Sequence, residues 1–145
     1  MSRRDDLHYP VRRALEKEGW VITHDPLELK FKEQTLKTDL GAERTLAAEK
    51  AGRKIAVEVK DFDGDSPISS LQKTVGQLHF YQWALNENEP DRELFLAVGE
   101  EVHNRLFQRP SFQYAVEQAR INLIVFDEIQ EVILQWIKQP NTQTS

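Results

Sequence analysis

The chain has 145 residues, of which 39% are hydrophobic and 30% are charged. This length suits one domain, residues 1–145, and the balance is that of a globular protein rather than a disordered one. The absence of cysteine excludes disulfides, thiolate catalysis and zinc sites built on sulfur. A formal net charge of -5 argues against a simple nucleic-acid binder, because proteins that hold DNA by its phosphates are usually basic or carry a basic face.

Membrane and zinc-site signals are both missing from the sequence. No apolar run approaches the roughly 20 residues that a helix needs to span a bilayer, and the first six residues lack the apolar stretch of a signal peptide. We therefore expect a cytoplasmic protein without membrane contacts. The four histidines, His8, His24, His79 and His103, show no zinc-ligand spacing and are each expected to be structural or exposed.

The N-terminal third predicts a helix followed by short strands. Apolar residues recur at helical spacing over about 6–18, and Gly19 follows where a C-terminal cap belongs. Strands are expected over 20–23 and 27–31, with a turn at 24–26. Two more strands, over 45–49 and 54–60, would form a hairpin that turns at 51–52.

The strand over 54–60 carries the most informative pattern. Its apolar residues Ile55, Val57 and Val59 alternate with Ala56, Glu58 and Lys60. Successive side chains of a strand point to opposite faces of a sheet, so the apolar trio is expected in the core. Glu58 and Lys60 would then share the other face.

The second half of the chain predicts alternating helices and buried strands. A polar loop leads to a helix in which Ser69 and Gln72 have capping-box spacing, ending near Asn86. Strands covered on both faces are expected over 94–98 and 121–126, and helices over 112–120 and 128–138. This order predicts an α/β domain with a mixed central sheet flanked by helices, and a frayed tail over about 140–145.

Two carboxylates and a lysine form the candidate catalytic set: Asp39, Glu58 and Lys60. Two carboxylates brought together can hold Mg²⁺ or Mn²⁺, with the Val59 carbonyl as a third ligand. Such a metal neutralises charge on a scissile phosphate, and a lysine beside it can orient or deprotonate the attacking water. Alone, Glu-x-Lys also fits a solvated sheet face. The apolar opposite face, the upstream acid and the following loop and helix favour the site.

The identity of the first acid stays open on the residues alone. If the hairpin turns at 51–52, Glu43 falls opposite Lys60, and Asp39 lies about 13 Å further along unless the chain bends at Gly41. Glu43 is therefore either a co-ligand or a replacement for Asp39, or a surface carboxylate paired with a cation. Gln77, on the second helix, is either an auxiliary to the metal site or a solvated glutamine.

The pairing of Thr38-Asp39 with Glu58-Val59-Lys60 resembles the PD-(D/E)XK nuclease signature, with threonine in place of the proline. Beyond it, GWVITHDP at 19–26, DLGAE at 39–43, AAEK at 47–50 and IAVEVK at 55–60 resemble the cyanobacterial XisH family, named as controlling factors for excision of the fdxN element. The resemblance covers about 5–137. It implies a restriction-endonuclease-like fold and a role in site-specific DNA rearrangement beside a recombinase and a small companion protein, XisI.

Two functions remain in view. The first is an Mg²⁺-dependent or Mn²⁺-dependent DNA endonuclease, in which Asp39 and Glu58 hold the metal and Lys60 assists the water. A domain of this size is expected to form a homodimer if it acts on both strands. The second is a non-catalytic accessory protein that binds a recombinase or an XisI-like partner, which suits the acidic net charge better. A generic α/β binding module explains the pattern least.

Overall fold

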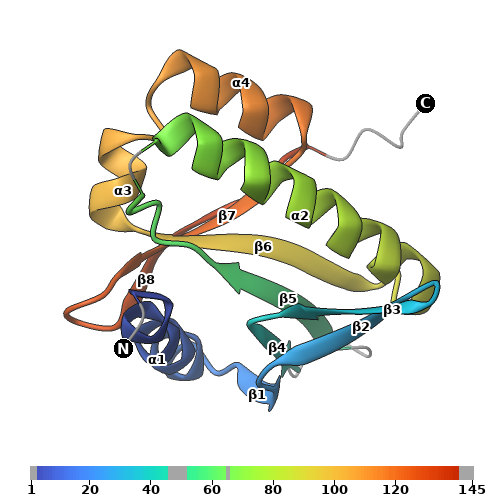
Figure 1. Cartoon of the computed structure of the whole chain (residues 1–145). Coiled ribbons are helices and arrows are strands. Elements are labelled where there is room, and N and C mark those ends of the chain that lie inside the picture. Colours follow the sequence, from blue (N-terminus) through green and yellow to red (C-terminus); the bar gives the residue numbers. More distant parts are fainter. Residues whose placement is uncertain (1–2, 46–51, 65, 141–145) are drawn as a thin grey trace.

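The computed structural model describes residues 3–45, 52–64 and 66–140, and these contain four helices and eight strands (Figure 1). The helices are α1 (Arg3–Lys17), α2 (Pro67–Asn88), α3 (Glu100–Arg105) and α4 (Pro110–Gln118). The strands are β1 (Val21–His24), β2 (Leu27–Phe31), β3 (Gln34–Thr38), β4 (Leu40–Arg44), β5 (Arg53–Val59), β6 (Arg92–Gly99), β7 (Asn122–Asp127) and β8 (Val132–Ile137). No described helix has the length and apolarity to cross a membrane.

Six strands form one mixed sheet in the order β1-β4-β5-β6-β7-β8. The central pairs β5–β6 and β6–β7 are parallel, whereas the pairs toward both edges are antiparallel. The parallel pairs are connected through helices, as parallel strands require. The predicted α/β class with a mixed central sheet is confirmed.

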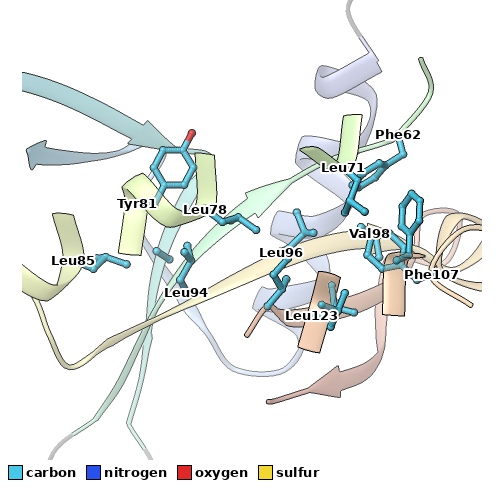
Figure 2. Packing of buried hydrophobic residues seen from close by; sticks show 14 of the residues in the cluster. Phe62, Leu71, Leu78, Tyr81, Leu85, Leu94, Leu96, Val98, Phe107 and Leu123 are labelled. Carbon is cyan, nitrogen blue, oxygen red and sulfur yellow. The ribbon is translucent and has the colours of Figure 1, made fainter. Parts of the chain in front are cut away.

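Helices cover both faces of this sheet, α2 on one and α1 on the other (Figure 1). The side chains of Ile55, Val57 and Val59 pack into the cluster that contains α1 residues such as Val11. Ala56 belongs to the opposite cluster, in which Leu71 and Leu78 of α2 pack over Leu96 of β6 (Figure 2). The predicted alternation along β5 is therefore correct, and it leaves Glu58 on the α2 face.

A two-stranded hairpin, β2–β3, stands apart from the main sheet and packs on α2. Its inward residues Leu27 and Leu29 are buried in the α2 cluster, while Glu28 and Lys30, which alternate with them, are exposed. Strand β3 and the short helix α3 are absent from the expectations, because neither carries an apolar pattern long enough to distinguish it from a loop.

The cap at the C-terminus of α1 agrees with the expectation, whereas the cap at the N-terminus of α2 differs from it. Gly19, after α1, has φ of 92°, which favours glycine. Helix α2 begins earlier than predicted, because Ser66 and not Ser69 is its N-cap: the Ser66 hydroxyl accepts the Ser69 amide at 3.3 Å. Pro67 takes the first helical position, where its missing N–H costs nothing. The helix runs to Asn88.

The helix predicted over 128–138 is wrong: the chain there makes a turn and then strand β8. Ile133 and Trp136 both pack on the α1 side, although residues three positions apart on a regular strand point to opposite faces. A bulge between the pairs Val125↔Gln135 and Phe126↔Ile133 inserts an extra residue and produces this helix-like spacing. The Asp127 carboxylate accepts the amides of Ile129 and Gln130 and stabilises the turn.

Two expectations fall largely or wholly outside the described residues. The strand predicted over 45–49 is one, since only Thr45 of it is described, and the tail predicted over about 140–145 is the other, since only Pro140 of it is described. The strand that pairs with β5 is instead β4, residues 40–44, and the connection back to β5 runs from Thr45 to Gly52.

Candidate active site

Asp39 sits at the junction where the chain leaves the hairpin and enters the main sheet, between β3 and β4. Its side chain is buried, with 1% of the residue exposed, and one carboxylate oxygen accepts the backbone amide of Val59 at 2.7 Å. The pairing of Leu40 with Val57 places Asp39 next to Glu58 across the two strands. The structure thus brings the first two predicted acids together.

Lys60 follows β5 directly and completes the group. Its ammonium lies 3.4 Å from Glu58 Oε2, and Glu58 is 6% exposed. The Lys60 amide donates to the Ala97 carbonyl at 3.1 Å, which extends the β5–β6 pairing by one residue and fixes the backbone beneath both side chains. Glu58 and Lys60 share a face, as the alternation predicts.

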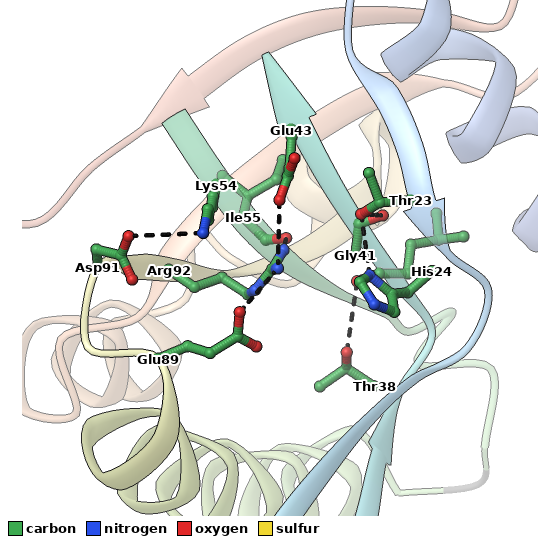
Figure 3. A network of polar contacts seen from close by, with 11 residues as sticks. Thr23, His24, Thr38, Gly41, Glu43, Lys54, Ile55, Glu89, Asp91 and Arg92 are labelled. Carbon is green, nitrogen blue, oxygen red and sulfur yellow. Dashed lines mark hydrogen bonds and ion pairs between the residues drawn. The ribbon is translucent and has the colours of Figure 1, made fainter. Parts of the chain in front are cut away.

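Glu43 lies elsewhere, and the register expected for it is wrong. It pairs with Lys54, not with Lys60, because the connection between the two strands is centred near residues 48–49 and not at 51–52. Its carboxylate lies 3.9 Å from Arg92, whose side chain is only 2% exposed (Figure 3). Arg92 also donates to the Ile55 carbonyl at 2.9 Å and to Glu89 at 3.0 Å. Glu43 therefore belongs to a polar network at the opposite end of the strand from Asp39.

An open hollow of about 570 Å³ lies over Glu58 and Lys60. Five parts of the chain contribute its walls: α1, the turn between β1 and β2, β3, β5 and α2. Its lining residues are His8, Tyr9, Asp25, Pro26, Lys37, Glu58, Lys60, Gln77 and Tyr81. Gln77, the predicted auxiliary, does face this hollow from α2.

An ion pair on one wall of the hollow was not foreseen. His8 Nε2 lies 2.8 Å from Asp25 Oδ1, and Arg12 Nη1 lies 2.5 Å from Asp25 Oδ2. Burial opposes ionisation of Asp25, but the hydrogen bonds from His8 and Arg12 outweigh it and hold the pKa of Asp25 below its usual value. The sequence shows Asp25 only as a turn residue, since nothing local indicates that α1 would meet this turn.

Charged side chains of both signs line the hollow. Glu58 and Asp25 are acidic, whereas Lys60 and Lys37 are basic, and Lys37 was also missed because an exposed lysine on a short strand carries no signal of its own. Carboxylates beside cationic groups suit a ligand that brings both a metal cation and a phosphate.

The donor set fits a hard divalent cation that keeps most of its waters. Within residues 3–45, 52–64 and 66–140 no group of three or more His, Asp or Glu side chains is placed to hold a metal. Asp39 and Glu58 are two buried carboxylates on adjacent strands. Mg²⁺ is commonly bound through one or two carboxylates, with water and substrate oxygens completing its shell. The Val59 carbonyl would be the third protein donor.

These features define a mixed α/β protein in which Glu58 and Lys60 line an open hollow and the buried Asp39 lies beside Glu58, outside the lining. The chain belongs to the XisH family: the family model described as XisH protein matches residues 1–134. A solved structure of an XisH family protein from Nostoc punctiforme PCC 73102 is similar, with 38% identity and a TM-score of 0.84, covering 92% of this chain and all of that one.

A second solved structure is that of an fdxN element excision controlling factor protein from Anabaena variabilis. It shares 40% identity with this chain at a TM-score of 0.83, and the match covers 93% of this chain and all of that one. No curated protein matches the sequence.

Proposed function

We propose that this chain acts in site-specific DNA rearrangement as an excision controlling factor, and that its hollow is a PD-(D/E)XK-type site hydrolysing DNA phosphodiesters. Membership of the XisH family and the similarity to the Anabaena variabilis protein, itself described as an fdxN element excision controlling factor, support the first part. The second part goes further and rests on the side chains of the hollow.

One observation carries the nuclease proposal: Asp39, just before β4, lies opposite Glu58 near the end of β5, with Lys60 3.4 Å from Glu58. Buried carboxylates are costly unless they are paired, hydrogen-bonded or bound to a metal. Glu58 and Lys60 also lie at the end of β5, a central strand of a mixed sheet that helices cover on both faces, and Asp39 directly precedes the neighbouring strand β4. This arrangement supports a restriction-endonuclease-like fold.

The chemistry follows from the same three residues. Asp39, Glu58 and the Val59 carbonyl would hold Mg²⁺ or Mn²⁺, which supplies positive charge against the scissile phosphate when bound. Lys60 donates hydrogen bonds to the attacking water and offsets negative charge developing on the phosphate. Lys37, on β3, lines the same hollow and would contact an adjacent phosphate.

A second candidate function is a non-catalytic accessory protein that binds an XisI-like partner or a recombinase. Two observations favour it: the net charge of -5 and a group of exposed aromatic side chains on α2. Phe80 and Trp83 are each nearly half exposed, and their ring centroids are 4.9 Å apart. Exposed aromatic groups of this kind are typical of protein-binding surfaces.

Calorimetric titration with Mg²⁺ and Mn²⁺, together with incubation on supercoiled and linear DNA, separates the two functions. We expect wild type to bind the metal and nick supercoiled DNA. Glu58→Gln should lose both properties, whereas Lys60→Met should keep metal binding and lose at least about 100-fold in cleavage rate.

Glu43→Gln is the matched control, since Glu43 lies on β4, the strand that follows Asp39 directly, but belongs to the Arg92 network. It should bind metal and cut DNA as wild type does. Absence of both metal binding and cleavage in wild type, also with an XisI-like partner present, would leave the accessory function.

A further inference from the structure

We infer that His8, held in place by Asp25, protonates the leaving oxygen when the hollow hydrolyses a phosphodiester. This inference rests on the proposed function, because it assigns a role within the same site. It adds a residue from α1 to a site otherwise built from β4 and β5.

The position of His8 is the first argument. His8 and the Glu58–Lys60 pair line one hollow, although they come from elements fifty residues apart in the chain. Its side chain is only 14% exposed, and Nε2 is engaged by Asp25 at 2.8 Å. The ring is thus fixed in orientation at the edge of the space that the substrate would fill.

The chemical requirement of the reaction is the second argument. As the bond from the water oxygen to phosphorus forms, the bond from phosphorus to the leaving oxygen breaks, and that oxygen takes the electron pair and needs a proton. Lys60 lies beside Glu58 and is assigned to the attacking water. Histidine is the one lining residue type whose ordinary pKa lies near neutral pH, which makes it the efficient proton donor under these conditions.

The proton balance of this step is simple. His8 in its doubly protonated form gives the Nδ1 proton to the leaving oxygen, while its Nε2–H remains bonded to Asp25. His8 then regains a proton from solvent, which also receives the proton lost by the attacking water. The reaction needs no further reactant.

Asp25 is a positioning residue in this arrangement, comparable to the acid that orients a catalytic histidine. Its two carboxylate oxygens are engaged by different partners, His8 on one and Arg12 on the other. Arg12 holds the carboxylate in place, and the carboxylate in turn fixes the orientation of the His8 ring. The Tyr9 ring meets His8 edge-on, with the centroids 5.1 Å apart.

A merely structural pair between α1 and the β1–β2 turn would give the same contacts, so the test must detect proton donation itself. A DNA duplex with bridging sulfur in place of the leaving oxygen provides this, because a thiolate leaves without a proton. Both possible bridging positions, 3′ and 5′, are tested, with Mn²⁺ in all reactions. The variants are His8→Ala, His8→Asn, Asp25→Asn and Lys60→Met.

On the ordinary oxygen substrate we expect His8→Ala and His8→Asn to lose about 100-fold or more in cleavage rate. On one of the two sulfur substrates both variants should come within a few-fold of wild type. Asp25→Asn should show a smaller loss that is also restored by sulfur. Lys60→Met should stay impaired on every substrate, and His79→Ala, an exposed histidine outside this hollow, should behave as wild type.

Two readouts other than cleavage complete the test. Mn²⁺ binding by calorimetry and DNA binding in Ca²⁺ should both be unchanged in His8→Ala. Equal loss of cleavage on oxygen and sulfur substrates, or no loss on oxygen, would overturn this inference while leaving the proposed nuclease in place. A wild-type protein that cuts none of the substrates would overturn the proposed nuclease activity and this inference with it.

Discussion

The carboxylate of Asp39 accepts the backbone amide of Val59 at 2.7 Å, which ties the residue before β4 to the last residue of β5. Both groups are buried, so this contact completes the hydrogen bonding of the sheet at the point where β4 begins. One oxygen of Asp39 therefore contributes to the fold, and the same side chain is proposed to hold a metal. The two roles are separable by substitution.

Asp39→Ala should destabilise the protein by about 1–3 kcal/mol, because it leaves the buried Val59 amide without an acceptor. Asp39→Asn keeps a side-chain oxygen that can accept this amide and should retain most of the stability, while losing Mn²⁺ binding. Urea denaturation and calorimetry on both variants check this. Equal destabilisation by the two substitutions would contradict the structural role of the hydrogen bond.

Arg92→Met should destabilise the protein by about 3 kcal/mol. The Arg92 guanidinium is buried and donates to the Ile55 carbonyl, so its removal leaves that carbonyl and nearby acids without their partner. Lys54→Met is the control: its ammonium lies 3.9 Å from Asp91 near the surface, and the change should cost less than about 1 kcal/mol. Denaturation in guanidinium chloride measures both costs. Similar midpoints for the two variants would contradict the larger stabilising role of Arg92.

Two glycines with open space around them should respond in opposite directions to alanine. At Gly19, φ of 92° strains any side chain, so Gly19→Ala should cost about 1 kcal/mol. Gly76 lies inside α2, and Gly76→Ala should stabilise the protein by about 0.5–1 kcal/mol. Thermal melts give both values, and a loss of stability at Gly76 would indicate a close contact on that face of α2.

Asp25→Asn should change the pH dependence of stability. The pKa of Asp25 is lowered in the folded protein, because the hydrogen bonds from His8 and Arg12 outweigh the cost of its burial. Its contribution, on the order of 1 kcal/mol, is complete above the unfolded value near 4 and is lost as pH falls through the lower folded value.

The difference in free energy of unfolding between wild type and Asp25→Asn should therefore shrink from pH 7 to pH 3. Urea denaturation at several pH values measures it. Glu28→Gln, which alters an exposed acid on β2, provides the control. A difference that grows on acidification would show that Asp25 is not ionised in the folded state.

Trp136→Ala should cost about 3 kcal/mol, whereas Leu134→Ala, two residues earlier, should cost less than about 1 kcal/mol. Trp136 packs against Trp20 and Phe95 with centroid distances of 5.7 and 5.1 Å, and its Nε1 donates to Glu18. Leu134 is nearly half exposed on the same strand. Comparable costs at the two positions would contradict the packing of β8 against α1.

The sequence by itself determined the features that depend on neighbouring residues. The alternation along β5 settled which side chains enter the core and that Glu58 and Lys60 share a face, because strand geometry alternates residue by residue. The helical spacing of Val11 and Leu15 and the glycine after them likewise located α1 and its end. The sequence also resembles the XisH family, and the comparisons confirm that the chain belongs to it.

Only the tertiary structure decided the features that depend on strand register and on contacts between distant elements. The connection from Thr45 to Gly52 is centred three residues earlier than the predicted turn at 51–52, and this shift brings Asp39 beside Glu58 and moves Glu43 away from Lys60. A bulge gave β8 the apolar spacing of a helix. The pairing of His8 with Asp25 joins α1 to a turn, and no local pattern encodes it, because periodicity records which face a residue takes but not which element it meets.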